Sequence, residues 1–118
     1  MTELEIRPYG HTLFFTCDKE AFLTKRSAYT EIPFDLEGTT GCSSDFGAIT
    51  HVMGVFDGKT ETLAHEVAHV CIKVLEYSGV PITRESSEAF CYLLSDLLEK
   101  LTPHLVIAES TQCELSSE

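Results

Sequence analysis

Two apolar patterns of helical period, separated by a short break, constrain the fold of this chain more than any other feature. Apolar residues recur every three or four positions over about 61–77 and again over about 84–101. Gly79 and Pro81 stand between them, where a glycine favours the end of a helix and a proline prevents its continuation. Because the break is short, we expect the second helix to return antiparallel to the first.

The preceding residues predict short strands and turns. Residues 4–7 and 12–17 have the pattern of a hairpin, and residues 48–56 that of a third strand. Asp18 is suited to cap a short helix that ends near residue 28. Residues 30–47 are punctuated by proline and glycine, which predicts an irregular surface loop or a loop that covers a substrate. After the second long helix, residues 104–108 predict one more strand or a docked tail.

These elements predict the α+β class, with a small antiparallel sheet packed on two main helices. The expected domain organisation is a single domain of residues 1–108, followed by a polar and mobile C-terminal tail at 109–118. A hydrophobic content of 43% in 118 residues is that of a globular protein rather than a disordered one.

Charge and cysteine usage exclude several classes of function. The formal net charge is −11, from 8 basic and 19 acidic residues, which disfavours binding to nucleic acid or to an anionic membrane. No apolar run approaches the ~20 residues of a membrane span, and the N-terminus lacks the pattern of a signal peptide. The five cysteines include no C-x-x-C pair, so we expect reduced thiols and a cytoplasmic protein.

The segment His65-Glu66-Val67-Ala68-His69 is an H-E-x-x-H motif inside the first long helix. Positions i and i+4 of a helix lie one above the other, so both imidazoles project from one face and can bind one Zn²⁺. Glu66 is then suited to act as the general base toward water at the metal. The alternative is a solvated helix face that happens to carry two histidines and a glutamate.

A catalytic zinc site needs a third protein ligand. On the returning helix Glu88 comes level with the two histidines and borders the apolar stripe, so we predict it as that ligand. Glu85, one turn earlier, is the closest alternative. Three further candidates are less well placed along the chain, namely Asp96, His51 and His104. Glu88 could instead be a charged rim residue that forms a weak surface ion pair.

Tyr92 lies one turn after Glu88 on the predicted helix and points the same way. Its phenol is suited to donate a hydrogen bond to an oxyanion or to orient the Glu88 carboxylate. We therefore predict Tyr92 as a catalytic residue beside Glu66, with an amphipathic tyrosine at the edge of the core as the alternative.

Together these motifs resemble zincin metallopeptidases of the Glu-ligand kind, in which a glutamate about twenty residues after H-E-x-x-H completes the zinc site. The stretch Glu85-Ser-Ser-Glu88-Ala-Phe-Cys-Tyr-Leu-Leu is similar to the second helix of small ImmA/IrrE-like peptidases, and to a group of short phage-encoded H-E-x-x-H proteins. The resemblance covers residues 48–101. It implies a minimal zincin-like domain, with Glu66 as base and with zinc held by His65, His69 and Glu88.

The resemblance also implies a substrate and a setting. In zincins the strand before the motif helix is an edge strand that pairs with an extended substrate, and residues 48–56 occupy that position here. The expected function is therefore zinc-dependent hydrolysis of peptide bonds in a peptide or protein substrate, in the host cytoplasm if the chain is phage-encoded. The alternatives are a catalytically inactive zincin-like binding protein and a metal-free acidic inhibitor of a partner protein.

Overall fold

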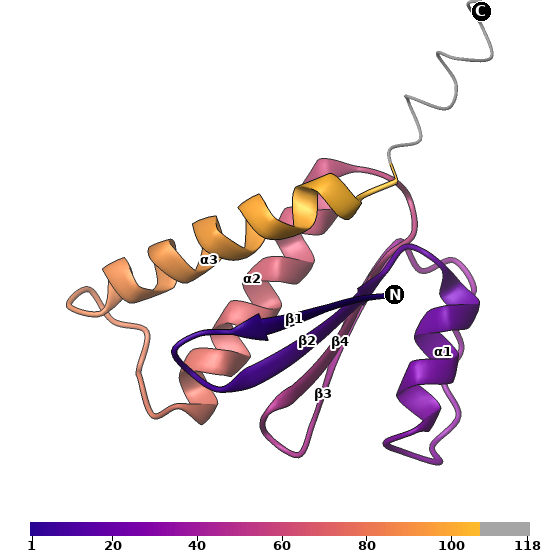
Figure 1. Ribbon diagram of the computed structural model, residues 1–118, viewed down its shortest axis with the longest axis horizontal. Helices are drawn as coiled ribbons and strands as arrows, with labels where there is room; N and C mark the ends of the chain where they lie inside the picture. Colours follow the sequence, from indigo (N-terminus) through magenta and orange to yellow (C-terminus); the bar gives the residue numbers. More distant parts are fainter. Residues whose placement is uncertain (107–118) are drawn as a thin grey trace, which may run out of the picture.

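A computed structural model describes residues 1–106 of the chain (Figure 1). Four strands form one sheet in the order β1-β2-β4-β3, and two long helices follow the sheet in the sequence. The strands are β1 (Thr2–Ile6), β2 (His11–Thr16), β3 (Gly41–Phe46) and β4 (Thr50–Val55). The helices are α1 (Lys19–Ser27), α2 (Thr60–Tyr77), α3 (Ser87–Leu101) and the 3₁₀ helix η1 (Thr102–His104).

The sheet lies between two helical layers, with α1 on one face and α2 and α3 on the other (Figure 1). Successive residues of a strand point to opposite faces, so each inner strand supplies both cores. Leu13 and Met53 pack in the core under α2 and α3, whereas Val52 packs with Phe22 of α1. The expectation of an α+β fold with two main helices is confirmed.

The helix pair forms the largest part of the core. Val67 and Val74 of α2 and Leu97 and Leu101 of α3 are almost completely buried. Burial of each such side chain contributes about 1.5–3 kcal/mol. This packing fixes α2 against the sheet and so positions the H-E-x-x-H motif. Among the described residues no helix combines the length and apolarity needed to cross a membrane.

The sheet is mixed, and the prediction of an antiparallel sheet is wrong in one respect. β1 pairs with β2 and β3 pairs with β4 in antiparallel register, but β2 and β4 run parallel. A parallel pair needs a crossover, and α1 together with residues 28–40 provides it before β3 begins. The hairpin pattern at the N-terminus could not reveal this, because it contains no information on which strand borders β2 on its other side.

The expected positions of the loop and the edge strand also need correction. Residues 41–46 form β3 rather than part of an irregular loop. β4 is an inner strand between β2 and β3, so the edge strand on this side is β3. β3 has the sequence Gly-Cys-Ser-Ser-Asp-Phe, which lacks the β-branched residues typical of strands. Its conformation is therefore imposed by its pairing with β4 and not by local preference.

The predicted helix boundaries hold for two helices and shift for the third. Asp18 caps α1, because its carboxylate accepts a hydrogen bond of 2.9 Å from the N–H of Ala21. α3 begins at Ser87 and not after Thr83, since Thr83 and Ser86 exchange hydrogen bonds that close a separate turn.

Of the two predictions for the segment after α3, a docked tail is confirmed for Leu105, which is buried against the main core. The predicted mobile tail at 109–118 lies outside the described residues.

Candidate functional site

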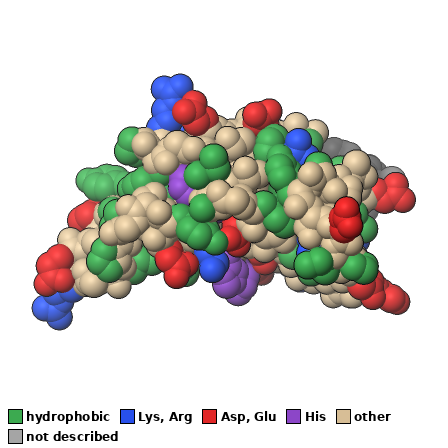
Figure 2. All heavy atoms as spheres, turned by 90° about the horizontal axis from the view of Figure 1, so that it is seen from below, with side chains coloured by type: hydrophobic (Ala, Val, Ile, Leu, Met, Phe, Trp, Pro, Cys, Tyr) green, Lys and Arg blue, Asp and Glu red, His purple; other side chains and the backbone are tan. Residues whose placement is uncertain are grey.

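His65 and His69 lie on the exposed face of α2, one helical turn apart. Their Nε2 atoms are 3.2 Å from each other, and the ring planes are inclined at 75°. Two imidazole ligands of a tetrahedral zinc, each at about 2.0–2.1 Å, have their nitrogens about 3.3 Å apart. The observed separation fits a hydrogen bond between the two rings, and it is also close to the separation of two ligands of one zinc ion. Figure 2 shows histidine side chains projecting from the margin of the molecule.

Glu66 points away from this face and toward the edge strand β3. Only 7% of its surface is exposed. A Cβ added at Gly41 would lie 3.1 Å from its Cγ and 3.2 Å from Oε2, so the absence of a side chain at position 41 makes room for the carboxylate. Burial raises the pKa of the neighbouring Cys42 thiol, and the negative charge of Glu66 raises it further.

The groove between α2 and β3 is a cavity of about 280 Å³, into which Glu66 and His69 both project. No hydrogen-bond donor among residues 1–106 contacts the Glu66 carboxylate, so its oxygens are open to a molecule in the cavity. A buried carboxylate without a protein donor is a suitable acceptor for a proton from water in the cavity. Lys73 also lines this cavity, and among residues 1–106 it is the only Lys or Arg side chain there.

The structure does not bring Glu88 into a ligand group with the two histidines. Glu88 is exposed in the first turn of α3, and Glu85 is exposed in the connection before that helix. Among residues 1–106 no group of three or more His, Cys, Asp or Glu side chains is close enough to hold a metal ion. The predicted third ligand, Glu88, is therefore not beside His65 and His69 in this structure.

Tyr92 is 73% exposed and lines a different cavity, of about 430 Å³, between α3 and the turn after β1. The structure therefore places it away from the groove that contains Glu66. Asp96, one turn later, forms an ion pair of 2.9 Å with Lys100. His104 is exposed at the end of η1.

His51 is almost completely buried in the sheet, where it lines the same cavity as Glu66 and His69. Its Nε2 atom is 2.8 Å from Nδ1 of His11, and the two rings stack with an interplanar angle of 17°. Burial lowers the pKa of His11, and it lowers that of His51 to about 4, assisted by the charge of His11. The sequence contains a signal for this pair, because positions 11, 13 and 15 and positions 51, 53 and 55 are the inward positions of two strands.

Comparisons with known proteins add no relative. No family model, no curated protein and no solved structure matches the chain. The functional argument therefore rests on the α2 motif and on the groove beside β3.

Proposed function

We propose that the protein is a zinc-dependent hydrolase of peptide bonds, with His65 and His69 as two metal ligands and Glu66 as general base. The 3.2 Å separation of the two Nε2 atoms is the observation that carries the proposal, because it suits two ligands of one tetrahedral ion. The position of Glu66 supports it further. On one turn of α2, the imidazole of His69 and the carboxylate of Glu66 reach the same cavity from different directions.

Glu88 is the proposed third ligand, with Glu85 as the alternative. Both carboxylates are exposed, and neither forms an ion pair within residues 1–106. Residues 81–85 are exposed along their whole length, so little packing holds the start of α3 in place. The free energy of metal binding can therefore stabilise a different position of this first turn.

The chemistry follows from the groups in the groove. Zinc, when bound, would act as a Lewis acid toward a carbonyl group and water. Glu66 accepts a proton from the attacking water and returns it to the leaving amine, so that one amide bond and one water molecule give a carboxylic acid and an amine. Burial of Glu66 beside Gly41 keeps the carboxylate in one orientation for both transfers.

The edge strand β3 supports a peptide as the substrate. Its outer side makes no strand pairing within residues 1–106, so its backbone N–H and C=O groups are available to an extended chain. A peptide bound there lies along the groove that contains Glu66. We further propose a cytoplasmic setting, which is supported by the free thiols of Cys17, Cys42, Cys71 and Cys91.

One observation favours a second function, which is binding without turnover. The three-ligand group is incomplete within residues 1–106, and a catalytically inactive relative that captures a peptide on β3 needs no such group. The two functions differ in the role of Glu66, which is essential only for hydrolysis.

The test compares wild type with Glu66→Gln on a mixture of unstructured peptides, with cleavage products identified by mass spectrometry. We expect wild type to cleave the mixture, and Glu66→Gln to retain its zinc but lose cleavage by about two to four orders of magnitude. Glu99→Gln is the matched control, because Glu99 is exposed on α3 and should leave cleavage unchanged. Cleavage by Glu66→Gln at the wild-type rate would refute the role of Glu66, and zinc-bound wild type that only binds peptides would favour the second function.

A further inference from the structure

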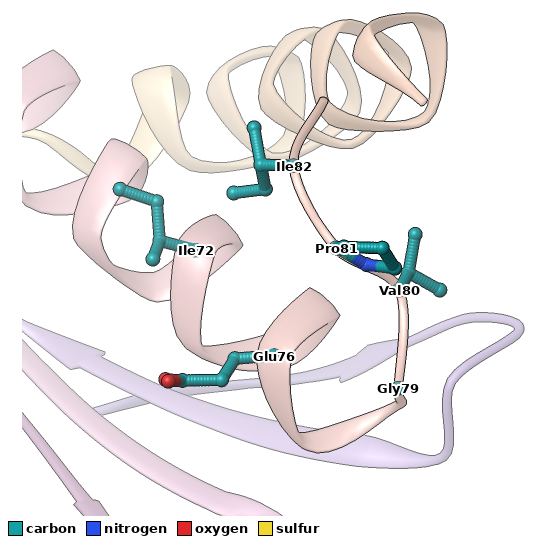
Figure 3. A pocket seen from close by; sticks show the side chains of 6 residues that line it. All are labelled: Ile72, Glu76, Gly79, Val80, Pro81 and Ile82. Carbon is teal, nitrogen blue, oxygen red and sulfur yellow. The ribbon is translucent and has the colours of Figure 1, made fainter. Parts of the chain in front are cut away.

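An open cavity of about 410 Å³ lies beside the C-terminal end of α2, where the chain turns toward α3 (Figure 3). The cavity lies on the same side of α2 as the two proposed metal ligands. Spacings of four, three and four residues separate His65, His69, Ile72 and Glu76. Such positions share one face of a helix. The lining residues are Ile72, Glu76, Gly79, Val80, Pro81 and Ile82.

The walls of this cavity are mainly aliphatic and open to solvent. Ile72 is 41% exposed and Ile82 is 47% exposed, and Pro81 and the half-buried Val80 extend the apolar lining along the connection. Figure 3 shows these side chains grouped around the last turns of α2 and the connection that follows. Apolar surface of this kind gains about 25 cal/mol for each Å² that a ligand covers.

The ionisable group that lines the cavity is acidic. Among residues 1–106 Glu76 is the only ionisable residue in the lining, and its charge is partly balanced by Lys73, which forms an ion pair with it. α2 ends at this place without a basic residue in its last turn, and the C-terminal end of a helix carries a partial negative charge that favours cations. The chain as a whole has a net charge of −11. An occupant with a positive charge is therefore favoured by three separate features.

We propose that this cavity binds a lysine or arginine side chain of the substrate peptide. The aliphatic stem packs on Ile72 and Ile82, and the cationic head lies at Glu76 beside the helix end. This proposal rests on the proposed hydrolase function in one respect, which is that the bound side chain belongs to a substrate peptide. Seven residues of helix separate His69 from Glu76, a rise of about 10 Å, which equals about three residues of extended peptide. The basic residue is therefore expected about three positions from the bond that is cleaved.

Lys73 of the protein itself already places a cation beside Glu76. Its Nζ atom lies 3.5 Å from Oε1 of Glu76, and the two side chains are 48% and 64% exposed. An exposed pair of this kind contributes little to stability, so a substrate cation can replace it. Lys73→Met should therefore strengthen the binding of a cation at Glu76, whereas Glu76→Gln should weaken it. If the ion pair of Lys73 and Glu76 had only a structural role, the two substitutions would not change the affinity for a cation in opposite directions.

The experiment uses side-chain analogues, so that its result does not depend on zinc or on turnover. ¹⁵N-labelled wild-type protein is titrated with n-butylguanidinium and, separately, with the uncharged n-butanol, and amide shifts are followed by NMR. We expect n-butylguanidinium to give saturable shifts at Gly79, Val80 and Ile82 and to bind more tightly than n-butanol. Glu76→Gln should weaken its binding by about two- to five-fold, and Lys73→Met should strengthen it by about two-fold.

Glu61→Gln is the matched control, because it removes the same charge from the other end of α2, about 22 Å away along the helix. It should leave the affinity for n-butylguanidinium close to that of wild type. Equal affinities for n-butylguanidinium and n-butanol would overturn the proposal, as would the absence of saturable shifts at these amides. If the cation binds but no peptide is cleaved, the cavity is a cation site and the proposed hydrolase function fails separately.

Discussion

The buried pair of His11 and His51 should make the stability of the fold depend on pH. Burial and, to a smaller extent, the neighbouring charge of His11 lower the pKa of His51 from 6.5 to about 4, against the opposing effect of Asp45. When folding lowers the pKa of a group, that group is protonated at a lower pH in the folded state than in the unfolded chain. His51 therefore contributes its full stability above pH 6.5, and this contribution is lost as the pH falls from 6.5 to about 4.

The expected loss is about 3 kcal/mol, since each pKa unit between 6.5 and about 4 corresponds to about 1.36 kcal/mol. His11 adds to the loss in the same direction, because burial lowers its pKa too. The assay is urea unfolding of wild type and His51→Gln at neutral pH and near pH 4. The Gln variant is expected to be less stable at neutral pH, by about 1 kcal/mol, but to lose about 3 kcal/mol less on acidification.

The carboxylates titrate in both wild type and His51→Gln, so their contribution cancels when the losses of stability of the two proteins are compared. His104→Gln is the matched control, because the side chain of His104 is exposed at the end of η1 and the variant should follow wild type. An equal loss of stability in wild type and His51→Gln would refute the assignment of this pH dependence to the buried pair.

Three further substitutions test the packing around the groove. Gly41→Ala places a Cβ 2.7 Å from Cγ2 of Thr62 and 3.1 Å from Cγ of Glu66. It should cost about 1–3 kcal/mol of folding free energy in urea unfolding and lower any peptide cleavage, and an unchanged stability and rate would contradict these close contacts. Leu97→Ala removes a side chain that is 1% exposed and should cost about 2–5 kcal/mol in the same unfolding assay, whereas a cost below about 1 kcal/mol would contradict its place in the core. Asp45→Ala removes the acceptor of the 2.6 Å hydrogen bond from Tyr77 and its negative charge, both of which raise the pKa of Tyr77; spectrophotometric titration should therefore show a tyrosine with a lower pKa than in wild type, and an unchanged titration would exclude the bond.

The elements that the sequence predicts well are those with their own periodicity or capping chemistry. α2 and α3 have apolar side chains at helical spacing, and Asp18 has the side chain that a helix N-terminus requires. The arrangement of the two H-E-x-x-H histidines could be predicted for the same reason, because it depends only on the local geometry of one helix.

The features that could not be predicted depend on contacts between distant segments. β3 has little strand preference of its own and forms a hairpin with β4 across residues 47–49, in which Gly47 and Ala48 have positive φ. The long-range feature is the parallel pairing of this hairpin with β2, which follows the crossover through α1. The place of Glu88 depends on the angle at which α3 leaves the turn at Thr83 and Ser86, which spacing along the chain does not determine. The groove beside Glu66 likewise arises from β3, so the sequence singles out Glu66 but does not predict the strand that encloses it.

The metal content of the purified protein tests the central claim most directly. Wild type, His69→Ala and Glu88→Ala would be purified without added metal and analysed by inductively coupled plasma mass spectrometry. The account predicts close to one zinc per chain in wild type, none in His69→Ala and a strongly reduced amount in Glu88→Ala. Absence of zinc from all three proteins, with a wild-type melting temperature that added zinc does not change, would contradict the assignment of His65 and His69 as metal ligands.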